Sequence, residues 1–358
     1  MRADAELVEI IHEVNAARDK RSFATMLLSA AAKDPKLQTG ILQFVDVLPT
    51  LVSSEDVYEH YRQFVGPHLA HLPKLLRFGA KLAEYPFSRA LAMRTLLWLV
   101  HKKVAPYFII SDERALARII ARFAREGTET SVDFLGELVC SFKEADCYLA
   151  TYSAAMHRHG GREKPFHVSV KFSALYPFLA PENSSESVRR VVEKFAKLLR
   201  IAKDTNSFVT VDAELYSTRR IAIEAFTETI LSEEFRRMEN VGIALQAYRK
   251  DALSAARHLV DVAEDRGAPF LIRLIKGAYL ETERAISEQK GWPSPVCGEK
   301  SETDRSFNEI NAYLMSHWGR VFVSPATHNP ENILYAEHLA EDLHITDDPR
   351  FMFQVLYG

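Results

Sequence analysis

The stretch HVSVKFS, residues 167–173, alternates polar and apolar side chains along a β-rich run. Successive side chains of a strand point to opposite faces, so one face of this stretch is polar. It carries His167, Ser169, Lys171 and Ser173. The stretch FVTVDAE repeats the pattern and carries Thr210, Asp212 and Glu214 on its polar face. Strands covered by helices on both faces are nearly all apolar, whereas barrel strands can carry polar groups into the upper lumen. The pattern therefore favours a closed barrel over an open doubly wound sheet.

Seven such runs alternate with amphipathic helices from about residue 130 onward. We predict strands within residues 131–137, 167–175, 208–215, 241–248, 270–277, 320–329 and 351–358. This alternation predicts parallel pairing and therefore an α/β fold, a (βα)8 TIM-like barrel. An eight-stranded barrel needs one strand more, and the sequence stops on the seventh run. We therefore expect a truncated piece that lacks the last strand and helix of the barrel.

The first part of the chain shows helical periodicity without strand signals. Apolar residues recur at three and four positions in segments such as AELVEIIHEVNAA and ERALARIIARFAREG. We predict a helical region over residues 1–127 and the barrel over residues 128–358.

The composition describes an ordinary globular protein, with 47% hydrophobic residues, 26% charged residues and a formal net charge of -3. No polybasic tail suggests a nucleic acid partner. The three cysteines, Cys140, Cys147 and Cys297, are too few for a disulfide framework. The charged N-terminus lacks the apolar core of a signal peptide, and ALAMRTLLWLVHKK is too short to span a membrane. We predict a cytoplasmic protein, with peripheral contact to the inner membrane left open.

Barrel enzymes place their active sites at the carboxyl ends of the strands. Those ends carry Glu137, Lys171, Asp212, Gln246, Arg273, Lys276, Thr327, His328 and Asn329. The excess of cations predicts anionic oxygens as ligands, such as cofactor phosphates or a substrate carboxylate. No G-x-G-x-x-G or G-x-x-x-x-G-K-[ST] motif occurs, so side chains would have to bind the phosphates. Gly277 allows close backbone approach beside Lys276.

Other chemistries find less support in the sequence. The histidine pairs lack a carboxylate pattern such as H-E-x-x-H, which argues against a metal site, and no G-x-S-x-G motif supports a serine nucleophile. Lys171 leaves a Schiff-base lyase open as an alternative. A non-catalytic or fragmentary barrel that needs a further C-terminal segment is the other alternative.

Five segments occur in a distinctive order and spacing: VSVKFSAL, VDAEL, LQAYRKD, IRLIKGAYLETE and ATHNPENI. They resemble the flavin-dependent proline dehydrogenases. The upstream segments RSFATMLLSAAAKDPKL, FVDVLPTL and SVDFLGELVCSFKEAD look most like the dehydrogenase half of the bifunctional proline utilization A proteins. The resemblance implies a barrel that binds FAD and oxidises L-proline to Δ1-pyrroline-5-carboxylate, with electrons passed to a membrane quinone. It also implies an aldehyde dehydrogenase domain elsewhere in a longer protein.

The resemblance also implies roles for individual residues. Asp212 would take the place of the family's active-site acid, Arg273 would approach the flavin N5, and Lys171 would lie by the flavin and the substrate carboxylate. Tyr279 would pack near the proline ring, and Glu137 would gate the pocket by pairing with an arginine of the final helix.

The remaining residues implied to bind FAD are Ala213, Gln246, Lys276, Gly277, Ala278, Thr327 and His328. The first two would lie along the ring system, the next three would form a cofactor-binding turn, and the last two would reach the ribose and phosphates.

The sequence departs from the family pattern in three places. It ends before the family's Y-x-x-R-R helix, whose arginines clamp the proline carboxylate, and this puts substrate binding in doubt. Leu280 stands where many relatives have a tryptophan beside the flavin. The segment PVCGEKSETD, residues 295–304, keeps only the outline of a family cofactor loop.

Overall fold

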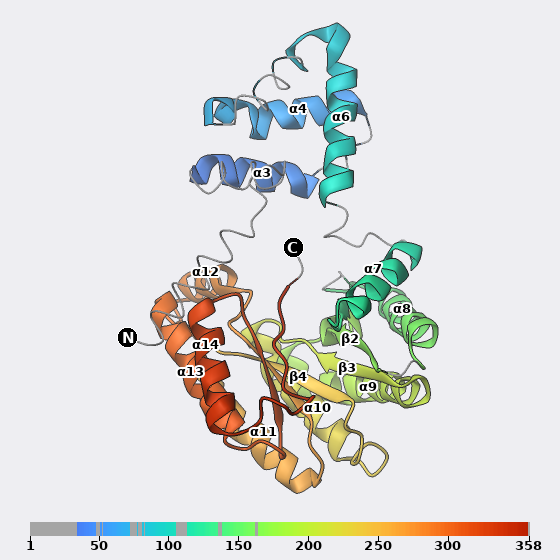
Figure 1. The fold of residues 1–358 in the computed structure, drawn as a ribbon, viewed down its shortest axis with the longest axis vertical. Helices are drawn as coiled ribbons and strands as arrows, with labels where there is room; N and C mark the ends of the chain where they lie inside the picture. The colour runs from blue at the N-terminus through green and yellow to red at the C-terminus, as the bar shows by residue number, and fades with distance from the viewer. Residues whose placement is uncertain are drawn as a thin grey trace. The chain divides into compact units, whose positions relative to one another are not determined.

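The computed structural model describes residues 34–47, 51, 53–71, 77, 81, 83–104, 113–134, 138–161 and 164–356. The chain divides into two compact units between Leu116 and Ala117 (Figure 1). The boundary near residue 127 stays a prediction. Glu137, one of the predicted site residues, lies outside the described residues.

The described part of the first unit is helical, as the periodicity predicts. It contains α3 (Pro35–Val47), α4 (Ser54–Phe64), the 3-10 helix η2 (Gly66–His71) and α6 (Pro86–Val104). Helix α4 begins with a capping box, in which the Asp56 N–H donates to Ser53 Oγ over 3.1 Å and the Ser53 N–H donates to Asp56 Oδ2 over 3.0 Å. A Cβ on Gly40 would lie 2.1 Å from the Phe64 carbonyl oxygen, so glycine permits the close approach of α3 to the end of α4.

The second unit is built on one parallel sheet whose strands follow the chain order. The strands are β1 (Ser131–Asp133), β2 (Phe166–Val170), β3 (Ser207–Val211), β4 (Val241–Gln246), β5 (Leu271–Ile275) and β6 (Phe322–Ala326). Neighbouring strands pair in parallel throughout the described sheet. The six strands form a half-barrel, as a sequentially ordered parallel sheet of this kind implies.

Helices lie around the strands in Figure 1, and those between residues 142 and 315 connect one strand to the next. The helices are α7 (Glu113–Arg125), α8 (Phe142–His159), α9 (Ser184–Thr205), α10 (Arg219–Leu231), α11 (Ala252–Arg266), α12 (Leu280–Lys290), α13 (Lys300–Met315) and α14 (Pro330–Asp342). Short 3-10 helices follow three loops: η3 (Phe172–Ala174), η4 (Pro181–Asn183) and η5 (Tyr216–Thr218). Gly267 is the C-cap of α11 and has a left-handed conformation with φ +68°, which glycine adopts without strain.

The core lies between the helices and one face of the sheet. On that face, valine and isoleucine side chains such as Val170, Val211 and Ile272 are fully buried in one cluster that also contains the apolar stripe of α9. This stripe contains Val188, Val191, Phe195, Leu198 and Leu199, which recur at helical spacing on one face of α9. The other face of the sheet, here called the inner face, is left for the polar residues.

The seventh predicted strand is reduced to one isolated bridge. Gln354 pairs with Ala326 in parallel, and its N–H donates to the Pro325 carbonyl over 3.1 Å. The rest of residues 351–356 forms no ladder, because the rings there pack sideways: Phe351 contacts Trp318 with centroids 6.1 Å apart. The Ser324 hydroxyl also donates a hydrogen bond to the Met352 carbonyl over 2.8 Å.

At the amino ends of β4 and β5 the chain buries one arginine completely. The Arg266 side chain is 2% exposed, and its guanidinium donates to the carbonyls of Ile230, Phe235, Met238, Ala268 and Pro269. Burial lowers the pKa of Arg266 to about 10, so the group stays charged at neutral pH. Arg266 therefore satisfies five backbone carbonyls at once, one in the last turn of α10 and four in the loops before β4 and β5.

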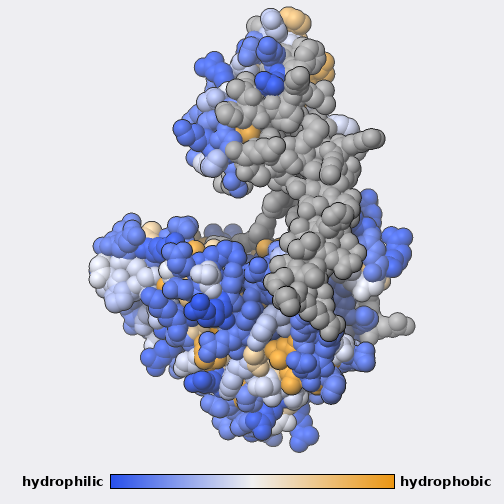
Figure 2. All heavy atoms as spheres, turned by 60° about the vertical axis from the view of Figure 1, so that its left-hand side comes forward, coloured by the Kyte–Doolittle hydropathy of each residue, from blue (hydrophilic) through white to orange (hydrophobic). Residues whose placement is uncertain are grey.

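The surface in the view of Figure 2 is mostly hydrophilic, with small apolar patches. None of the helices that the structure describes combines the length and the apolarity that a membrane span needs.

Candidate active site

The strand register places the predicted catalytic residues in one layer of the sheet. Val170 pairs across from Val211, and this row continues along the sheet through Ile243, Ile272 and Val323. The next residue on each strand is Lys171, Asp212, Ala244, Arg273 and Ser324, in order from β2 to β6. Because side chains alternate, and the valine row packs on the helices, this layer faces inward.

Arg273 reaches across the inner face from β5 to three other strands. Its Nη1 donates to Asp212 Oδ1 over 2.7 Å and to Ser169 Oγ over 2.8 Å, and its Nη2 donates to Ser131 Oγ over 3.2 Å. Strand β4 lies between β5 and β3, and its residue in the layer is Ala244. A small side chain there leaves room for the guanidinium to reach Asp212.

Lys171 completes the network from β2. Its Nζ donates to Asp133 Oδ1 over 2.7 Å and lies 3.9 Å from Asp212 Oδ2. Burial acts to lower the pKa of Lys171, but the hydrogen bond and charge of Asp133, with the charge of Asp212, outweigh it and raise the pKa. The amine is therefore held protonated, which suits anion binding and opposes the Schiff-base alternative.

Three carboxyl groups lie beside the two cations: Asp212 and Glu214 are largely buried, and Asp133 is exposed. Asp133, Asp212 and Glu214 surround Lys171 and Arg273. Burial raises the pKa of Asp212 against the opposing charge of Arg273, and burial raises the pKa of Glu214 against the hydrogen bonds from Ser173. A site of this composition holds fixed charges of both signs in little water.

The next layer joins the ends of β2, β3 and β4. The Ser173 N–H donates to Glu214 Oε2 over 3.1 Å, and its hydroxyl contacts Glu214 Oε1. Gln246 Nε2 donates to the Glu214 carbonyl over 3.1 Å. In the part of the chain that the structure describes, Gln246 Oε1 and Arg273 Nε are buried without a hydrogen-bond partner. Two polar atoms of the predicted site thus remain available to a ligand.

The predicted turn Lys276–Ala278 follows β5 directly. Lys276 forms an ion pair with Asp304, which also accepts from Lys300 Nζ over 2.5 Å. Gly277 has φ +132°, a conformation that other residues rarely adopt. Ala278 is exposed, and Tyr279 is half-buried at the start of α12.

Thr327 and His328 follow β6 beside this turn, because Ala326 pairs with Ile275. Thr327 is buried, and its Oγ1 accepts the Asn329 N–H over 3.0 Å. His328 is exposed. The register therefore brings the ends of β5 and β6 together, whereas Lys171, Asp212 and Arg273 meet through direct contacts.

The sequence interpretation missed Asp133 and Ser131 as members of the site. Both belong to a strand of three residues, and they alternate around Val132 as Ser169 and Lys171 alternate around Val170. The two-residue spacing of Ser131 and Asp133 is the sequence signal that could have identified them. Within the described ranges, no group of three or more His, Cys, Asp or Glu side chains is placed to hold a metal ion.

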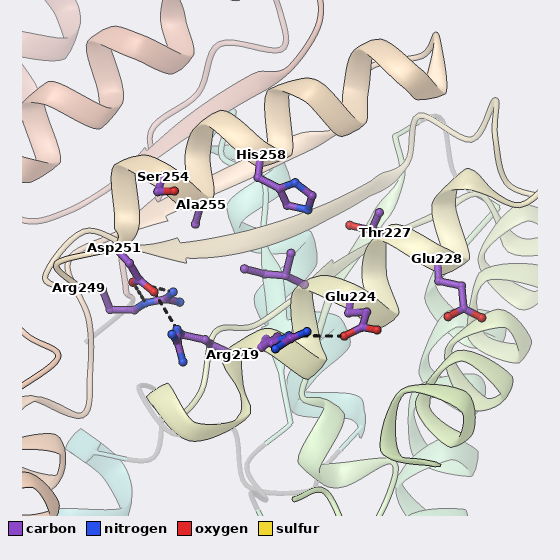
Figure 3. Close-up of a pocket in the computed structure, with 11 residues that line it drawn as sticks. Arg219, Glu224, Thr227, Glu228, Arg249, Asp251, Ser254, Ala255 and His258 are labelled. Atoms are coloured by element: carbon purple, nitrogen blue, oxygen red, sulfur yellow. Dashed lines mark hydrogen bonds and ion pairs between the residues drawn. The ribbon is translucent and has the colours of Figure 1, made fainter. Parts of the chain in front are cut away.

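A pocket of about 520 Å³ lies elsewhere, between α10 and α11 (Figure 3). None of the predicted site residues lines it. Asp251 stands between two of its arginines and accepts from Arg219 Nε and Arg249 Nε, each over 2.9 Å. These charges of the pocket neutralise one another, so the pocket does not favour a charged ligand.

Comparison with known proteins gives the family. The family model for proline dehydrogenase matches residues 116–358, and the model for the proline utilization A N-terminal domain matches residues 4–98. The chain belongs to the proline dehydrogenase family. This confirms the resemblance found in the five sequence segments.

The proteins to which this chain is similar include bifunctional PutA proteins and proline dehydrogenases. Bifunctional protein PutA of Salmonella typhimurium is 27% identical over 260 residues, which are 70% of this chain and 20% of that protein. Proline dehydrogenase 1 of Bacillus subtilis is 26% identical over 254 residues, which are 70% of this chain and 73% of that protein. The chain thus spans about a fifth of the length of the PutA proteins that it matches.

Solved structures confirm the fold. PutA from Bdellovibrio bacteriovorus inactivated by N-propargylglycine matches all of this chain and 37% of its own, with a TM-score of 0.84 and 25% identity. PutA from Corynebacterium freiburgense matches 80% of this chain and 29% of its own, with a TM-score of 0.67 and 25% identity. The predicted TIM-like barrel architecture and helical N-terminal region are therefore correct for the described residues.

Proposed function

We propose that this chain carries out the FAD-dependent oxidation of L-proline to Δ1-pyrroline-5-carboxylate and passes the electrons to a membrane quinone. One observation carries the proposal: Lys171, Asp212 and Arg273 converge in a buried network at the carboxyl ends of the strands. Barrel enzymes place their active sites at the carboxyl ends of the strands, and the proline dehydrogenase family model covers this part of the chain.

The free polar atoms of the site fit a flavin. The isoalloxazine edge offers both acceptors and an N–H donor, and the site offers the buried Arg273 Nε–H as a donor and the buried Gln246 Oε1 as an acceptor. Lys276 and His328 would attract the phosphates from the ends of β5 and β6, and Gly277 would let the backbone approach them.

When bound, the flavin supplies the capacity to accept a hydride, and the protein supplies orientation and charge. Lys171, held protonated, would bind the substrate carboxylate. Arg273, fixed by Asp212 and two serines, would keep a positive charge where negative charge develops. Tyr279 would pack against the proline ring, because near-attack geometry requires the ring to be held in place. Glu137 would gate the pocket.

The wider setting is proposed on the same basis. The PutA relatives are named bifunctional, and this chain would be the dehydrogenase part of such a protein, with an aldehyde dehydrogenase domain as its partner. A quinone acceptor would require a cytoplasmic protein that contacts the inner membrane at its surface.

An absorbance scan tests the proposal. We expect the purified chain to be yellow or to take up added FAD, and anaerobic proline to bleach the flavin bands. A chain that stays colourless and binds no FAD contradicts the proposal. If FAD binds but proline does not bleach it, the carboxylate clamp lies outside this chain, and adding the family's Y-x-x-R-R segment should restore bleaching.

Borohydride trapping separates the flavoenzyme from a Schiff-base lyase. The raised pKa of Lys171 predicts that no covalent adduct with a carbonyl substrate forms at this lysine at neutral pH. A trapped adduct on Lys171, detected by mass spectrometry, would favour the lyase instead.

A further inference from the structure

Tyr248 lies two residues after β4 and is 3% exposed, although no role in the proposed chemistry uses it. Its ring lies against Gly277 in the turn after β5. A Cβ on Gly277 would come within 2.4 Å of the Tyr248 Cδ1 and 2.5 Å of its Cε1. The ring therefore fills the space that a side chain at position 277 would need.

The backbone of Tyr248 also contacts the surrounding loops. Its N–H donates to the Lys276 carbonyl over 2.8 Å, and its carbonyl accepts the Cys297 N–H over 2.8 Å. The neighbouring Arg249 forms an antiparallel bridge with Val296. One residue thus joins the end of β4 to the turn after β5 and to the loop before α13.

The hydroxyl group extends these contacts to the end of the turn. Burial raises the pKa of Tyr248 to about 12, the charge of Glu283 adds to the shift, and a hydrogen bond from the backbone of Tyr279 opposes it. The phenol stays protonated at neutral pH. Tyr248 therefore touches the turn at Lys276, at Gly277 and at Tyr279.

We propose that Tyr248 is a positioning residue that holds the Lys276–Tyr279 turn in the conformation that binds the anionic cofactor. This inference rests on the proposed function. Gly277 has φ +132°, which the turn would not keep without support, because glycine is the most freely moving residue of the chain. A ring packed flat on the glycine supplies that support without touching the cofactor.

Two substitutions of Tyr248 test the role of the ring. We expect Tyr248→Phe, which keeps the ring, to raise the FAD dissociation constant by less than about threefold, and Tyr248→Leu to raise it by about tenfold or more. Phe226→Leu is the matched control, because Phe226 is equally buried but packs in the core against Phe195 and Phe270. The control should lose stability without a change in FAD affinity. Equal FAD affinity in wild type and Tyr248→Leu overturns the inference.

Hydrogen exchange of the flavin-free protein tests the inference apart from the function. We expect the amides of residues 276–279 to exchange faster in Tyr248→Leu than in wild type, and to keep their wild-type rates in Phe226→Leu. Unchanged exchange in Tyr248→Leu overturns the positioning role. A wild-type chain that binds no FAD overturns the proposed function instead, while the exchange result still decides whether Tyr248 holds the turn.

A double-mutant cycle tests the contact itself. Gly277→Ala should weaken FAD binding strongly in wild type, and less strongly in a Tyr248→Ala background, where the ring no longer blocks the new Cβ. Coupling of this sign supports the proposal. Strictly additive effects would mean that the ring and the glycine act independently, and would overturn it.

Discussion

Two buried arginines distinguish the two ends of the sheet. Arg266, at the amino ends of β4 and β5, is 2% exposed and donates only to backbone carbonyls. Arg273, toward the carboxyl ends, is 9% exposed and donates to the side chains of Asp212, Ser169 and Ser131. Its Nε has no partner in the described part of the chain.

The difference shows how one residue type serves two purposes. Carbonyls of the loops cannot be exchanged by mutation, so the contacts of Arg266 depend on the fold alone. The contacts of Arg273 depend on three side chains, those of Asp212, Ser169 and Ser131, and its Nε–H donates to none of them. We therefore expect changes at the amino end to alter stability and changes at the carboxyl end to alter chemistry.

The largest effect should come from Arg266→Met. This change removes the Arg266 donor from five backbone carbonyls, of which Phe235 keeps the Met238 N–H as a donor, and each carbonyl left unsatisfied costs about 1–3 kcal/mol before the loops relax. We expect the free energy of unfolding, measured in urea, to fall by about 4 kcal/mol or more. Arg200→Met is the control: its exposed ion pair with Glu234 should be worth less than about 1 kcal/mol. Equal losses in the two variants would break the contrast.

Arg273→Met should act mainly on catalysis. We expect flavin reduction by proline to slow by about a hundredfold or more, because the fixed positive charge is lost. The free energy of unfolding should fall by no more than about 2 kcal/mol, since Asp212 keeps Lys171 at 3.9 Å and can take up a proton. Arg273→Lys should recover part of the rate. A variant that unfolds as easily as Arg266→Met would place Arg273 with the structural group.

His167 offers a pH test of the amino end. It lies near the start of β2, stacked on Phe208 with ring centroids 4.6 Å apart, and burial lowers its pKa to about 4. The His167 imidazole takes up a proton near pH 6.5 in the unfolded chain, but only near pH 4 in the folded chain. The stability that the folded chain has above pH 6.5 is therefore lost progressively as the pH falls from 6.5 to 4. The loss should reach about 3 kcal/mol.

Stability curves at several pH values would measure this loss. His167→Phe should remove most of the pH dependence between 6.5 and 4 while leaving flavin binding at neutral pH unchanged. A pH profile identical to that of the wild type would show that another group is responsible.

The smallest effect should come from Asp304→Asn at the carboxyl end. Asp304 pairs with Lys276 and Lys300 near the surface, so its loss should cost less than about 1 kcal/mol of stability. Removal of the negative charge should strengthen FAD binding by about twofold at low salt, and less at high salt. Weaker FAD binding at low salt would show that Asp304 orients Lys276 rather than competing for it.

The sequence was sufficient for the six paired strands and for the proximity of Lys171, Asp212 and Arg273. Alternation placed Lys171 and Asp212 on the polar faces of two strands, and the charged position inside the run of β5 marked Arg273. These signals are local: each depends on the two-residue period of one strand. Parallel pairing then brought the three residues into one layer.

Other features depend on contacts that no local pattern encodes. Arg266 has the spacing of an ordinary basic residue in the last turn of a helix, and its five acceptors, at the end of α10 and in two loops, carry no motif. Tyr248 ends an apolar run and reads as one more core residue, because its contact with Gly277 joins two different loops. The last predicted run has strand-like composition, but Phe351 packs on Trp318 and the run forms only one isolated bridge.

The partners of Arg273 are spread widely along the chain: 61 residues separate it from Asp212, 104 from Ser169 and 142 from Ser131. Contacts of such long range form late in folding, since each requires the intervening loops to close first. A ribosome must therefore release β5 before any of the Arg273 contacts can form. Formation of the guanidinium contacts reports that the sheet is complete as far as β5, and no misfolded chain that lacks β1, β2 or β3 can display them all.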